Sequence, residues 1–347
     1  MGRGRHSPVR GNPARGMTRL PVLGLGLLVA IGVLVVVVES RSGGGPAGTA
    51  AATRSTAAGH AAATSPGPPA PRAGVTSAAV AASDGAASPG GSAIPGGAAS
   101  KARGNPLGPS AAAYLGTRSG VVVAAVYDLG TQQSWTIGSA GQAQDEASVV
   151  KVDVLEALLA QRPGGLPATD QALAQRMIED SDNDAATTLW DTVGGASGIR
   201  AFNAHVGLNA TAPSACVQCP GFPWPGWGLT TTTPLDQIAL LRQLVSPSGS
   251  VLTAPERDYA LRLMENVTAH QRWGVSGGVP AQATVALKNG WLPLNAAQTD
   301  WQVNSVGWVS GLGRDYLIAV LSTQNPSEAY GIETISELSA LVWQHMA

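Results

Sequence analysis

The stretch DEASVVKVDVLEALL, residues 145 to 159, has apolar residues at helical spacing and places a serine three positions before a lysine. The chain has 21 Lys and Arg residues, of which only Lys101, Lys151 and Lys288 are lysines. A guanidinium stays charged under physiological conditions, whereas a desolvated ammonium can lower its pKa and act as a base. The position of Lys151 therefore invites a chemical explanation.

Ser148 and Lys151 are three residues apart, which on a helix places them on one face, about 5 Å from each other. At the first turn of a helix the backbone N–H groups are unpaired and the macrodipole is positive, so an oxyanion is stabilised there. A neutral Lys151 could accept the hydroxyl proton of Ser148 and make the oxygen nucleophilic. Taken alone, the pair is equally compatible with a serine at a helix start followed by a surface lysine.

Two later segments carry further polar groups. Ser181 and Asn183 lie in IEDSDNDAATTLW, between two helical segments, where a helix cap is the alternative interpretation. Lys288 ends a β-branched run in ATVALKNGWLP and is followed by Asn289 and Gly290, where a charged strand end with a turn is the alternative. Together the three segments use both lysines of the part of the chain that can fold.

In this order the motifs resemble the signature of class A β-lactamases and penicillin-binding proteins, which is S-x-x-K, then S-D-N, then a K-T-G-like triplet on a late strand. The resemblance covers roughly residues 108 to 347. It implies an α/β (α+β) fold, in which helices flank an antiparallel sheet and an all-helical subdomain is inserted. The stretch from Ser148 to Ser181 is shorter than in typical class A enzymes, so we expect this subdomain to be trimmed.

The resemblance implies a catalytic role for three side chains. Ser148 is the expected acylated nucleophile and Lys151 its base partner. The hydroxyl of Ser181 is expected to relay a proton to the leaving nitrogen. The expected oxyanion hole consists of the backbone N–H groups of Ser148 and Trp291.

The resemblance also implies three substrate-binding residues. Asn183 is expected to bind the substrate's side-chain carbonyl, and Lys288 to supply positive charge near Ser181 and the substrate carboxylate. Asn289 replaces the usual Thr or Ser hydroxyl of the triplet, and its amide can still donate to a carboxylate.

The loop before GLTTTTPLDQIALL matches the place where class A enzymes carry the glutamate that activates the deacylating water. Here it reads TAPSACVQCPGFPWPGWG and contains no acid, so a penicilloyl-serine is expected to persist. Cys216 and Cys219 lie in this loop, and outside the membrane a disulfide is their expected state. Trp224 and Trp227 could line the cleft, with core or lid packing as the alternative.

Strand and helix patterns surround these motifs. Strands are predicted at residues 120–129 and 134–138, as a hairpin, and in ATVALKNGW, WQVNSVGWVSG and RDYLIAVLST. Helices are predicted at residues 149–160, 169–178, 184–193, 234–244 and 257–267 and in the closing GIETISELSALVWQHM. We expect one sheet with strands from both ends of the domain, and separate α and β subdomains are the alternative.

Composition divides the 347 residues into four parts. Residues 1–20 are basic and expected to be cytoplasmic, and residues 21–38 are an apolar run about 27 Å long as a helix, which predicts a single-pass membrane anchor. A cleaved signal followed by secretion is the alternative, and a lipoprotein is excluded because no cysteine lies near the run. Residues 39–105 predict a disordered Ala/Gly/Ser/Pro linker, and residues 106–347 the folded domain.

These features predict a membrane-tethered, extracytoplasmic serine hydrolase that acts on amide or ester bonds and deacylates β-lactams poorly. The alternatives are a genuine β-lactamase with a different base and a catalytically weak domain that binds cell wall or a partner. The expected substrate is a β-lactam, cell-wall peptide or ester, and the expected catalytic domain is monomeric. We expect no nucleic acid as a partner, because the part of the sequence expected to fold has no basic stripe. We also expect no cofactor and no metal, because the sequence has no phosphate-binding glycine loop and no metal-ligand spacing.

Overall fold

The computed structural model describes Met1 and residues 103–347. Apart from Met1 and residues 103–105, the expected basic segment, membrane anchor and linker lie outside the described residues, so these domain boundaries stay predictions. Within the described part of the chain no helix combines the length and the apolar character needed to cross a bilayer.

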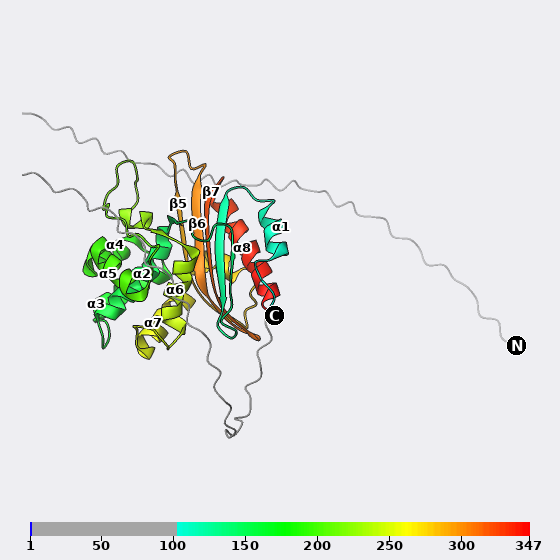
Figure 1. Cartoon of the computed structure of the whole chain (residues 1–347), viewed down its shortest axis with the longest axis horizontal. Coiled ribbons are helices and arrows are strands. Elements are labelled where there is room, and N and C mark those ends of the chain that lie inside the picture. Colours follow the sequence, from blue (N-terminus) through cyan, green and yellow to red (C-terminus); the bar gives the residue numbers. More distant parts are fainter. Residues whose placement is uncertain (2–102) are drawn as a thin grey trace, which may run out of the picture. The chain divides into compact units, whose positions relative to one another are not determined.

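A five-stranded antiparallel sheet forms the centre of the domain (Figure 1). Its strand order is β2-β1-β7-β6-β5, so strands from both ends of the domain lie side by side, as predicted. The β-branched and aromatic residues that fill these strands favour extended backbone. The strands are β1 (Val121–Asp128), β2 (Ser134–Ile137), β5 (Thr284–Pro293), β6 (Trp301–Gly311) and β7 (Arg314–Asn325).

Helices cover both faces of this sheet (Figure 1). One face is covered by the first and last helices, α1 (Pro109–Leu115) and α8 (Glu328–His345). The other face carries the helical insert, which consists of α2 (Val150–Gln161), α3 (Ala168–Glu179), α4 (Asn183–Thr192), α5 (Gly195–Val206), α6 (Pro234–Val245) and α7 (Ala254–Glu265). The predicted α+β class, with helices flanking an antiparallel sheet, is therefore confirmed.

Short elements complete the path of the chain. A second, two-stranded sheet pairs β3 (Gln144–Asp145) with β4 (Thr231–Thr232), just before the S-x-x-K motif. The four 3₁₀ turns are η1 (Ala147–Val149), η2 (Gly226–Leu229), η3 (Ala269–Gln271) and η4 (Gly274–Ser276).

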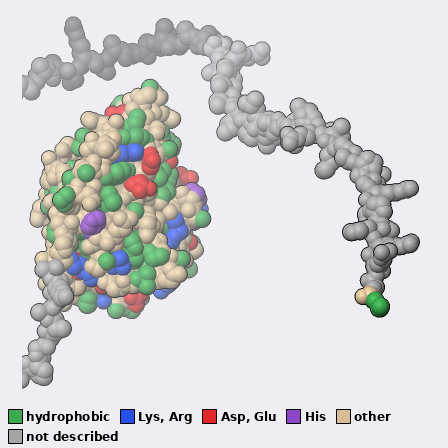
Figure 2. Space-filling model, turned by 90° about the vertical axis from the view of Figure 1, so that its right-hand side faces the viewer, with side chains coloured by type: hydrophobic (Ala, Val, Ile, Leu, Met, Phe, Trp, Pro, Cys, Tyr) green, Lys and Arg blue, Asp and Glu red, His purple; other side chains and the backbone are tan. Residues whose placement is uncertain are grey.

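Two hydrophobic cores lie on opposite sides of the sheet. Successive side chains of a strand point to opposite faces, and in β1 Val123 and Ala125 enter the core beneath the helical insert. The intervening Ala124 and Val126 enter the core beneath α1 and α8. On the face seen in Figure 2, acidic, basic and apolar side chains are interspersed.

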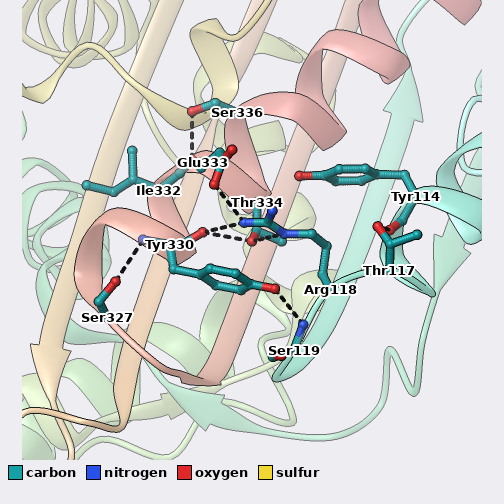
Figure 3. A network of polar contacts seen from close by, with 10 residues as sticks. All are labelled: Tyr114, Thr117, Arg118, Ser119, Ser327, Tyr330, Ile332, Glu333, Thr334 and Ser336. Atoms are coloured by element: carbon teal, nitrogen blue, oxygen red, sulfur yellow. Dashed lines mark hydrogen bonds and ion pairs between the residues drawn. The ribbon is translucent and has the colours of Figure 1, made fainter.

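Arg118 ties the segment after α1 to the last helix (Figure 3). Its guanidinium lies 3.8 Å from the ring centroid of Tyr330, donates to Thr334 Oγ1 at 2.9 Å and pairs with Glu333 at 3.0 Å. The Tyr330 hydroxyl accepts from the backbone N–H of Ser119 at 2.7 Å. Stacking and hydrogen bonding together hold α1 beside α8.

Helix α5 was not predicted, because Gly195, Ser197 and Gly198 are poor helix formers. The helix nevertheless forms, since it buries Ile199 and Phe202 in the core of the helical insert. Gly198 is required there: a Cβ at this position would lie 1.8 Å from the carbonyl oxygen of Val193. Tertiary packing thus overrides a weak local preference. The short helix α1 was also missed.

Candidate active site

Ser148 lies in the 3₁₀ turn η1, immediately before α2, so the expected helix-start position is correct. The preceding residue, Ala147, has φ of 51°, in the left-handed region that a non-glycine residue rarely adopts. Asn304 of β6 holds this segment, because its amide donates to the carbonyl oxygens of Asp145 at 2.8 Å and Glu146 at 2.9 Å. Asn304 is thus a positioning residue that the motif pattern did not reveal.

Lys151 is fully buried and its Nζ has three oxygen neighbours. They are Ser181 O at 2.6 Å, Asn183 Oδ1 at 2.8 Å and Ser181 Oγ at 3.0 Å. Burial lowers the pKa of Lys151 well below its usual value, and the nearby Lys288 lowers it further, against the opposing effect of Asp182. A neutral amine fits these contacts: it can donate to the two carbonyl-type oxygens and accept the proton of the Ser181 hydroxyl.

Lys288 approaches the same hydroxyl from strand β5. Its Nζ donates to Ser181 Oγ at 3.0 Å and to the carbonyl oxygen of Asn289 at 2.8 Å. Burial lowers the pKa of Lys288 to about 7. The Ser181 hydroxyl therefore lies between two buried amines, each 3.0 Å away, and can accept from Lys288 while it donates to Lys151.

The S-D-N motif forms the start of α4. Asp182 is the N-cap, and its side chain accepts from the backbone N–H of Ala185 at 2.8 Å. Ser181, just before it, has φ of 57°, a strained value that turns its hydroxyl and its carbonyl toward Lys151. Since Asn183 Oδ1 is engaged by Lys151, the Nδ2 hydrogens are the part of this amide left for a substrate. The helix-cap interpretation of the motif is thus correct, and the roles expected of Ser181 and Asn183 with a substrate stay predictions.

Strand β5 runs directly against the turn that carries Ser148. A Cβ at Gly290 would lie 2.6 Å from the backbone nitrogen of Ser148 and 2.8 Å from the carbonyl oxygen of Glu146. Only glycine allows this approach. The next residue, Trp291, lines the cleft and packs edge-on against Trp273, with ring centroids 5.9 Å apart.

We expected the side chain of Asn289 to face the cleft, but it points into the protein. Its Nδ2 donates to the carbonyl oxygens of Gln271 at 2.7 Å and Trp273 at 3.2 Å, and the side chain is 1% exposed. Both amide hydrogens are therefore engaged inside the protein. The geometry argues against the expected contact between Asn289 and a substrate carboxylate, and gives the residue a structural task between β5 and the segment around η3.

The expected hydrogen bond between Ser148 and Lys151 is not formed. Across residues 103–347 the Ser148 hydroxyl has no hydrogen-bond partner, and Lys151 Nζ is engaged with Ser181 and Asn183. Catalytic hydrogen bonds are often loose before the substrate binds. Ser148 does line the cleft with Ser181 and Asn183, so the nucleophile and the relay group share one solvent space.

The loop before β4 closes over Lys151. A disulfide joins Cys216 and Cys219, whose Cα atoms are 5.6 Å apart. The Trp227 ring lies 5.0 Å from Lys151 Nζ, and its Nε1 donates to Thr187 Oγ1 at 3.1 Å. The loop in which class A enzymes carry a glutamate thus brings a tryptophan close to the amine. No acidic residue lines the small cavity between Ser148 and this loop within the described structure.

The cleft itself has a volume of about 420 Å³. Two acids, Asp180 and Glu328, and His270 lie at its rim, while no arginine or lysine lines it in the described part of the chain. The remaining lining residues are Ser148, Ser181, Asn183, Trp224, Gln271, Trp291, Pro293, Gln298 and Trp301.

Three buried carboxyl groups, one before and two within α2, were not singled out by the sequence. Glu146, Asp153 and Glu156 are each 0% exposed. Burial raises the pKa of all three, to about 7 for Asp153, and neighbouring carboxylates raise them further, while a hydrogen bond from Asn203 opposes the rise at Asp153. They do not form a metal site, since residues 103–347 contain no cluster of three or more His, Cys, Asp or Glu suited to a metal ion.

Comparisons with known proteins identify the family and the fold. A family model described as "Beta-lactamase enzyme family" matches residues 163–346, which include Ser181, Asn183 and Lys288. Proteins named "Putative lipoprotein LppW" in Mycobacterium tuberculosis and Mycobacterium bovis are 28% identical over 224 residues. That match covers 61% of this chain and 66% of theirs, so the chain spans slightly less than two thirds of these relatives.

Solved structures share the fold. An ancestral class A β-lactamase is 22% identical with a TM-score of 0.56, over 68% of this chain and 98% of its own. The class A β-lactamase from Mycobacterium abscessus is also 22% identical with a TM-score of 0.56, over 68% and 97%. The TLA-1 extended-spectrum β-lactamase is 18% identical with a TM-score of 0.59, over 68% and 96%.

Proposed function

The chain belongs to the beta-lactamase enzyme family and is a serine hydrolase, and from this premise we propose that it works through an acyl-enzyme on Ser148, with Lys151 as the base. The observation that carries the proposal is the Ser181 hydroxyl, 3.0 Å from both Lys151 Nζ and Lys288 Nζ. Two buried amines with lowered pKa values around one hydroxyl are an arrangement for moving a proton.

Acylation follows from these contacts. Neutral Lys151 takes the proton of Ser148 as Oγ attacks the substrate carbonyl carbon. The oxyanion forms beside the backbone N–H groups of Ser148 and Trp291. When the C–N or C–O bond breaks, Ser181 passes a proton to the leaving group and recovers one from Lys151. Water then cleaves the acyl-serine, releases a carboxylic acid and restores the Ser148 hydroxyl.

We propose that β-lactams are deacylated slowly. The loop that resembles the glutamate-bearing loop contains no acid and brings Trp227 to 5.0 Å from Lys151 Nζ. The cavity beside Ser148 has no acidic lining residue in residues 103–347. The engaged amide of Asn289 also leaves a β-lactam carboxylate one donor fewer. Neutral esters or amides therefore fit the site better than carboxylated β-lactams.

A genuine β-lactamase with a different base is the second candidate. Asp180, His270 and Glu328 line the same cleft as Ser148, and each can in principle accept a proton from water. These groups support this candidate less strongly than Trp227 beside Lys151 and the acid-free cavity beside Ser148 support slow deacylation.

We propose a membrane-associated, extracytoplasmic location. It is supported by the name of the relatives, "Putative lipoprotein LppW". The two cysteines of this chain, Cys216 and Cys219, lie far from the N-terminal apolar run, so attachment depends on residues 21–38 and not on a lipidated cysteine. Deletion of residues 21–38 is expected to move the protein from the membrane fraction to the soluble fraction.

The test uses purified full-length protein, a labelled penicillin and a neutral p-nitrophenyl ester. We expect ester hydrolysis and a penicilloyl adduct that persists in intact-mass spectra, both lost in Ser148→Ala. The control Ser139→Ala, at an exposed serine, keeps both. Rapid penicillin turnover supports the second candidate, and no adduct together with no ester hydrolysis refutes the hydrolase mechanism.

A further inference from the structure

The loop before β4 carries a disulfide whose two cysteines are separated by only two residues. Cys216 and Cys219 are both half-buried, and between them Val217 is 73% exposed and Gln218 is also exposed. The disulfide therefore lies at the surface, within reach of a thiol in solution. A disulfide that closes a short loop contributes little to the stability of the whole fold, and exposed disulfides are the ones that exchange readily with thiols.

The ring closed by the disulfide supports the turn that leads to Trp227. The backbone N–H of Gly226 donates to Val217 O at 3.0 Å. A Cβ at Gly226 would lie 1.8 Å from Cys216 O and 3.1 Å from Cys219 Sγ, so the backbone at this point rests directly on the ring. Only glycine permits this contact. Since Trp227 is the next residue, its position depends on the shape of the ring.

Trp227 in turn contacts two residues of the candidate active site. Its side chain is 6% exposed, and its ring lies 5.0 Å from Lys151 Nζ. Its Nε1 donates to Thr187 Oγ1 at 3.1 Å, and that hydroxyl donates to the carbonyl oxygen of Asn183 at 2.9 Å. Asn183 Oδ1 accepts from Lys151 Nζ at 2.8 Å. One glycine and one tryptophan thus connect the disulfide to Lys151.

The same loop forms one wall of the small cavity at Ser148. The loop residues that line this cavity are Phe222, Trp224, Pro225, Trp227 and Gly228. Phe222 is attached to the ring, because its backbone N–H donates to Cys219 O at 3.0 Å. A change in the ring is therefore transmitted to the space around the nucleophile as well as to the surroundings of Lys151.

We propose that Cys216 and Cys219 form a thiol–disulfide exchange site, through which a reducing dithiol releases this loop and lowers the activity of the enzyme. The loss of activity rests on the proposed role of Lys151 as the base, whereas the exchange itself does not.

The exchange takes place in two steps. A thiolate of the dithiol attacks one sulfur of the disulfide, and the other cysteine leaves as a thiolate that takes up a proton. The second thiol of the dithiol then attacks the mixed disulfide and expels the first cysteine, which is protonated in the same way. Two electrons pass to the protein, which now holds two thiols, and the dithiol becomes a disulfide.

The direction of the effect follows from the surroundings of Lys151. Burial is the largest effect that lowers the pKa of Lys151, ahead of Lys288 and against the opposing effect of Asp182. When the ring opens, Gly226 loses its support, and water reaches the side of the amine that faces the Trp227 ring. A more hydrated amine holds its proton more tightly, so a smaller fraction of Lys151 is neutral and able to act as a base.

The experiment treats the purified full-length protein with dithiothreitol, a small dithiol. Alkylation with iodoacetamide followed by intact-mass analysis gives the reduced fraction. We expect kcat/KM for a neutral p-nitrophenyl ester to fall by about tenfold as this fraction rises, and to recover on reoxidation. Hydrogen exchange of residues 216–229 should accelerate on reduction, while that of α2 stays unchanged, because only the loop is released.

Two variants test the route from the disulfide to Lys151. The double variant Cys216→Ser/Cys219→Ser should hydrolyse the ester at the rate of the reduced protein and should not respond to dithiothreitol. Trp227→Ala should lower the rate of the oxidised protein and reduce its response to dithiothreitol to less than about twofold, because it removes the connecting side chain. A full tenfold response in Trp227→Ala contradicts this route.

The remaining outcomes separate this proposal from the hydrolase mechanism. If the native protein hydrolyses no ester but exchange in the loop accelerates on reduction, the mechanism is refuted and the exchange site stands. A disulfide that is reduced only when α2 also loses its protection overturns the exchange site. Reduction that changes neither the rate nor the hydrogen exchange of the loop overturns the connection to Lys151 and leaves the mechanism standing.

Discussion

Helix α2 buries ionisable side chains on two of its sides. One side carries the basic Lys151, here called the cationic side, and the other carries the carboxyl groups of Asp153 and Glu156, here called the acidic side. Lys151 and Lys288 meet at the hydroxyl of Ser181. Asp153 and Glu156 are also buried, and within residues 103–347 neither carboxyl group is hydrogen-bonded to that hydroxyl or to either lysine. Residues two apart on a helix do not face each other, so Lys151 and Asp153 diverge. Among the described residues neither Lys151 nor Lys288 takes part in an ion pair.

Because the lysines and the buried carboxyl groups do not pair with one another, each of them favours its uncharged state. Burial lowers the pKa of Lys151 and Lys288 and raises that of Asp153 and Glu156, and like charges nearby reinforce the shifts at Lys151, Asp153 and Glu156. A buried Lys–Asp pair would do the opposite and keep the amine charged. Lys151 can therefore act as a base, because burial and Lys288 lower its pKa against the opposing effect of Asp182 and it has no ion pair among the described residues.

Lys151→Arg removes the group on the cationic side that can accept a proton. A guanidinium cannot lose its proton near neutral pH, so we expect kcat/KM for a neutral ester to fall by about 10²- to 10⁴-fold. Steady-state kinetics give the loss, and circular dichroism shows whether the fold persists. A folded variant with a loss below about tenfold would remove Lys151 from the role of base.

Asp153→Asn tests the acidic side through the pH dependence of stability. The pKa of Asp153 is raised from 3.8 to about 7, so between these values the folded protein keeps a proton that the unfolded chain loses. Stability from this carboxyl is complete below about pH 4 and is lost as the pH rises through about 7, by at most about 4 kcal/mol. The pKa of Lys288 falls from 10.5 to about 7. The contribution of Lys288 to the free energy of unfolding therefore changes above about pH 7, outside the range in which Asp153 acts.

Urea unfolding at several pH values measures this effect. The free energy of unfolding of the native protein should fall more steeply from pH 4 to 7 than that of Asp153→Asn. The exposed Asp191→Asn is the matched control and should follow the native protein. Parallel curves for the native protein and Asp153→Asn would show that this carboxyl is ionised in the folded state.

Trp227→Glu brings an acid to the cationic side. A carboxylate in place of the ring, now 5.0 Å from Lys151 Nζ, stabilises the ammonium and raises the pKa of Lys151. The midpoint of the pH profile of kcat/KM for a neutral ester should move up by about one unit or more. Trp227→Gln has nearly the same shape without the charge and should not shift the midpoint, and an equal shift in both variants would contradict the electrostatic explanation.

Glu156→Leu removes the carboxyl group on the acidic side that accepts no hydrogen bond among the described residues. Neither carboxyl oxygen of Glu156 has a hydrogen-bond partner within residues 103–347, so an apolar side chain of similar volume should stabilise the fold by about 1 kcal/mol at pH 8. Thermal unfolding measures the change. The exposed Glu337→Leu on α8 should stay within about 0.5 kcal/mol, and a clear destabilisation by Glu156→Leu would reveal a favourable partner for this carboxyl.

Local patterns predicted most of the architecture. The β-branched and aromatic run in GVVVAAVYDL predicted β1, and the apolar residues at helical spacing after Ser148 predicted α2, because both signals lie within the segment itself. Helix α5 escaped this reasoning, since its glycines are tolerated only where Ile199 and Phe202 pack into the core. Weak local preference cannot report contacts made by distant segments.

The sequence revealed the candidate site residues more readily than it revealed their hydrogen-bond partners. The spacing from Ser148 to Lys151 placed both at the start of α2, but the partners of Lys151 come from 30 and 32 residues away. Asn289 shows the reverse problem, because its amide is engaged by carbonyl groups that no local pattern identifies.

The sequence by itself determined the α+β class, the order of the three motifs and a loop without an acid, because spacing and composition are local properties. Only the tertiary structure decided that one hydroxyl lies between two amines, that Trp227 covers Lys151 and that three carboxyl groups are buried apart from them. The physical reason is that burial and neighbouring charge set each pKa, and both depend on how segments far apart in the chain pack together.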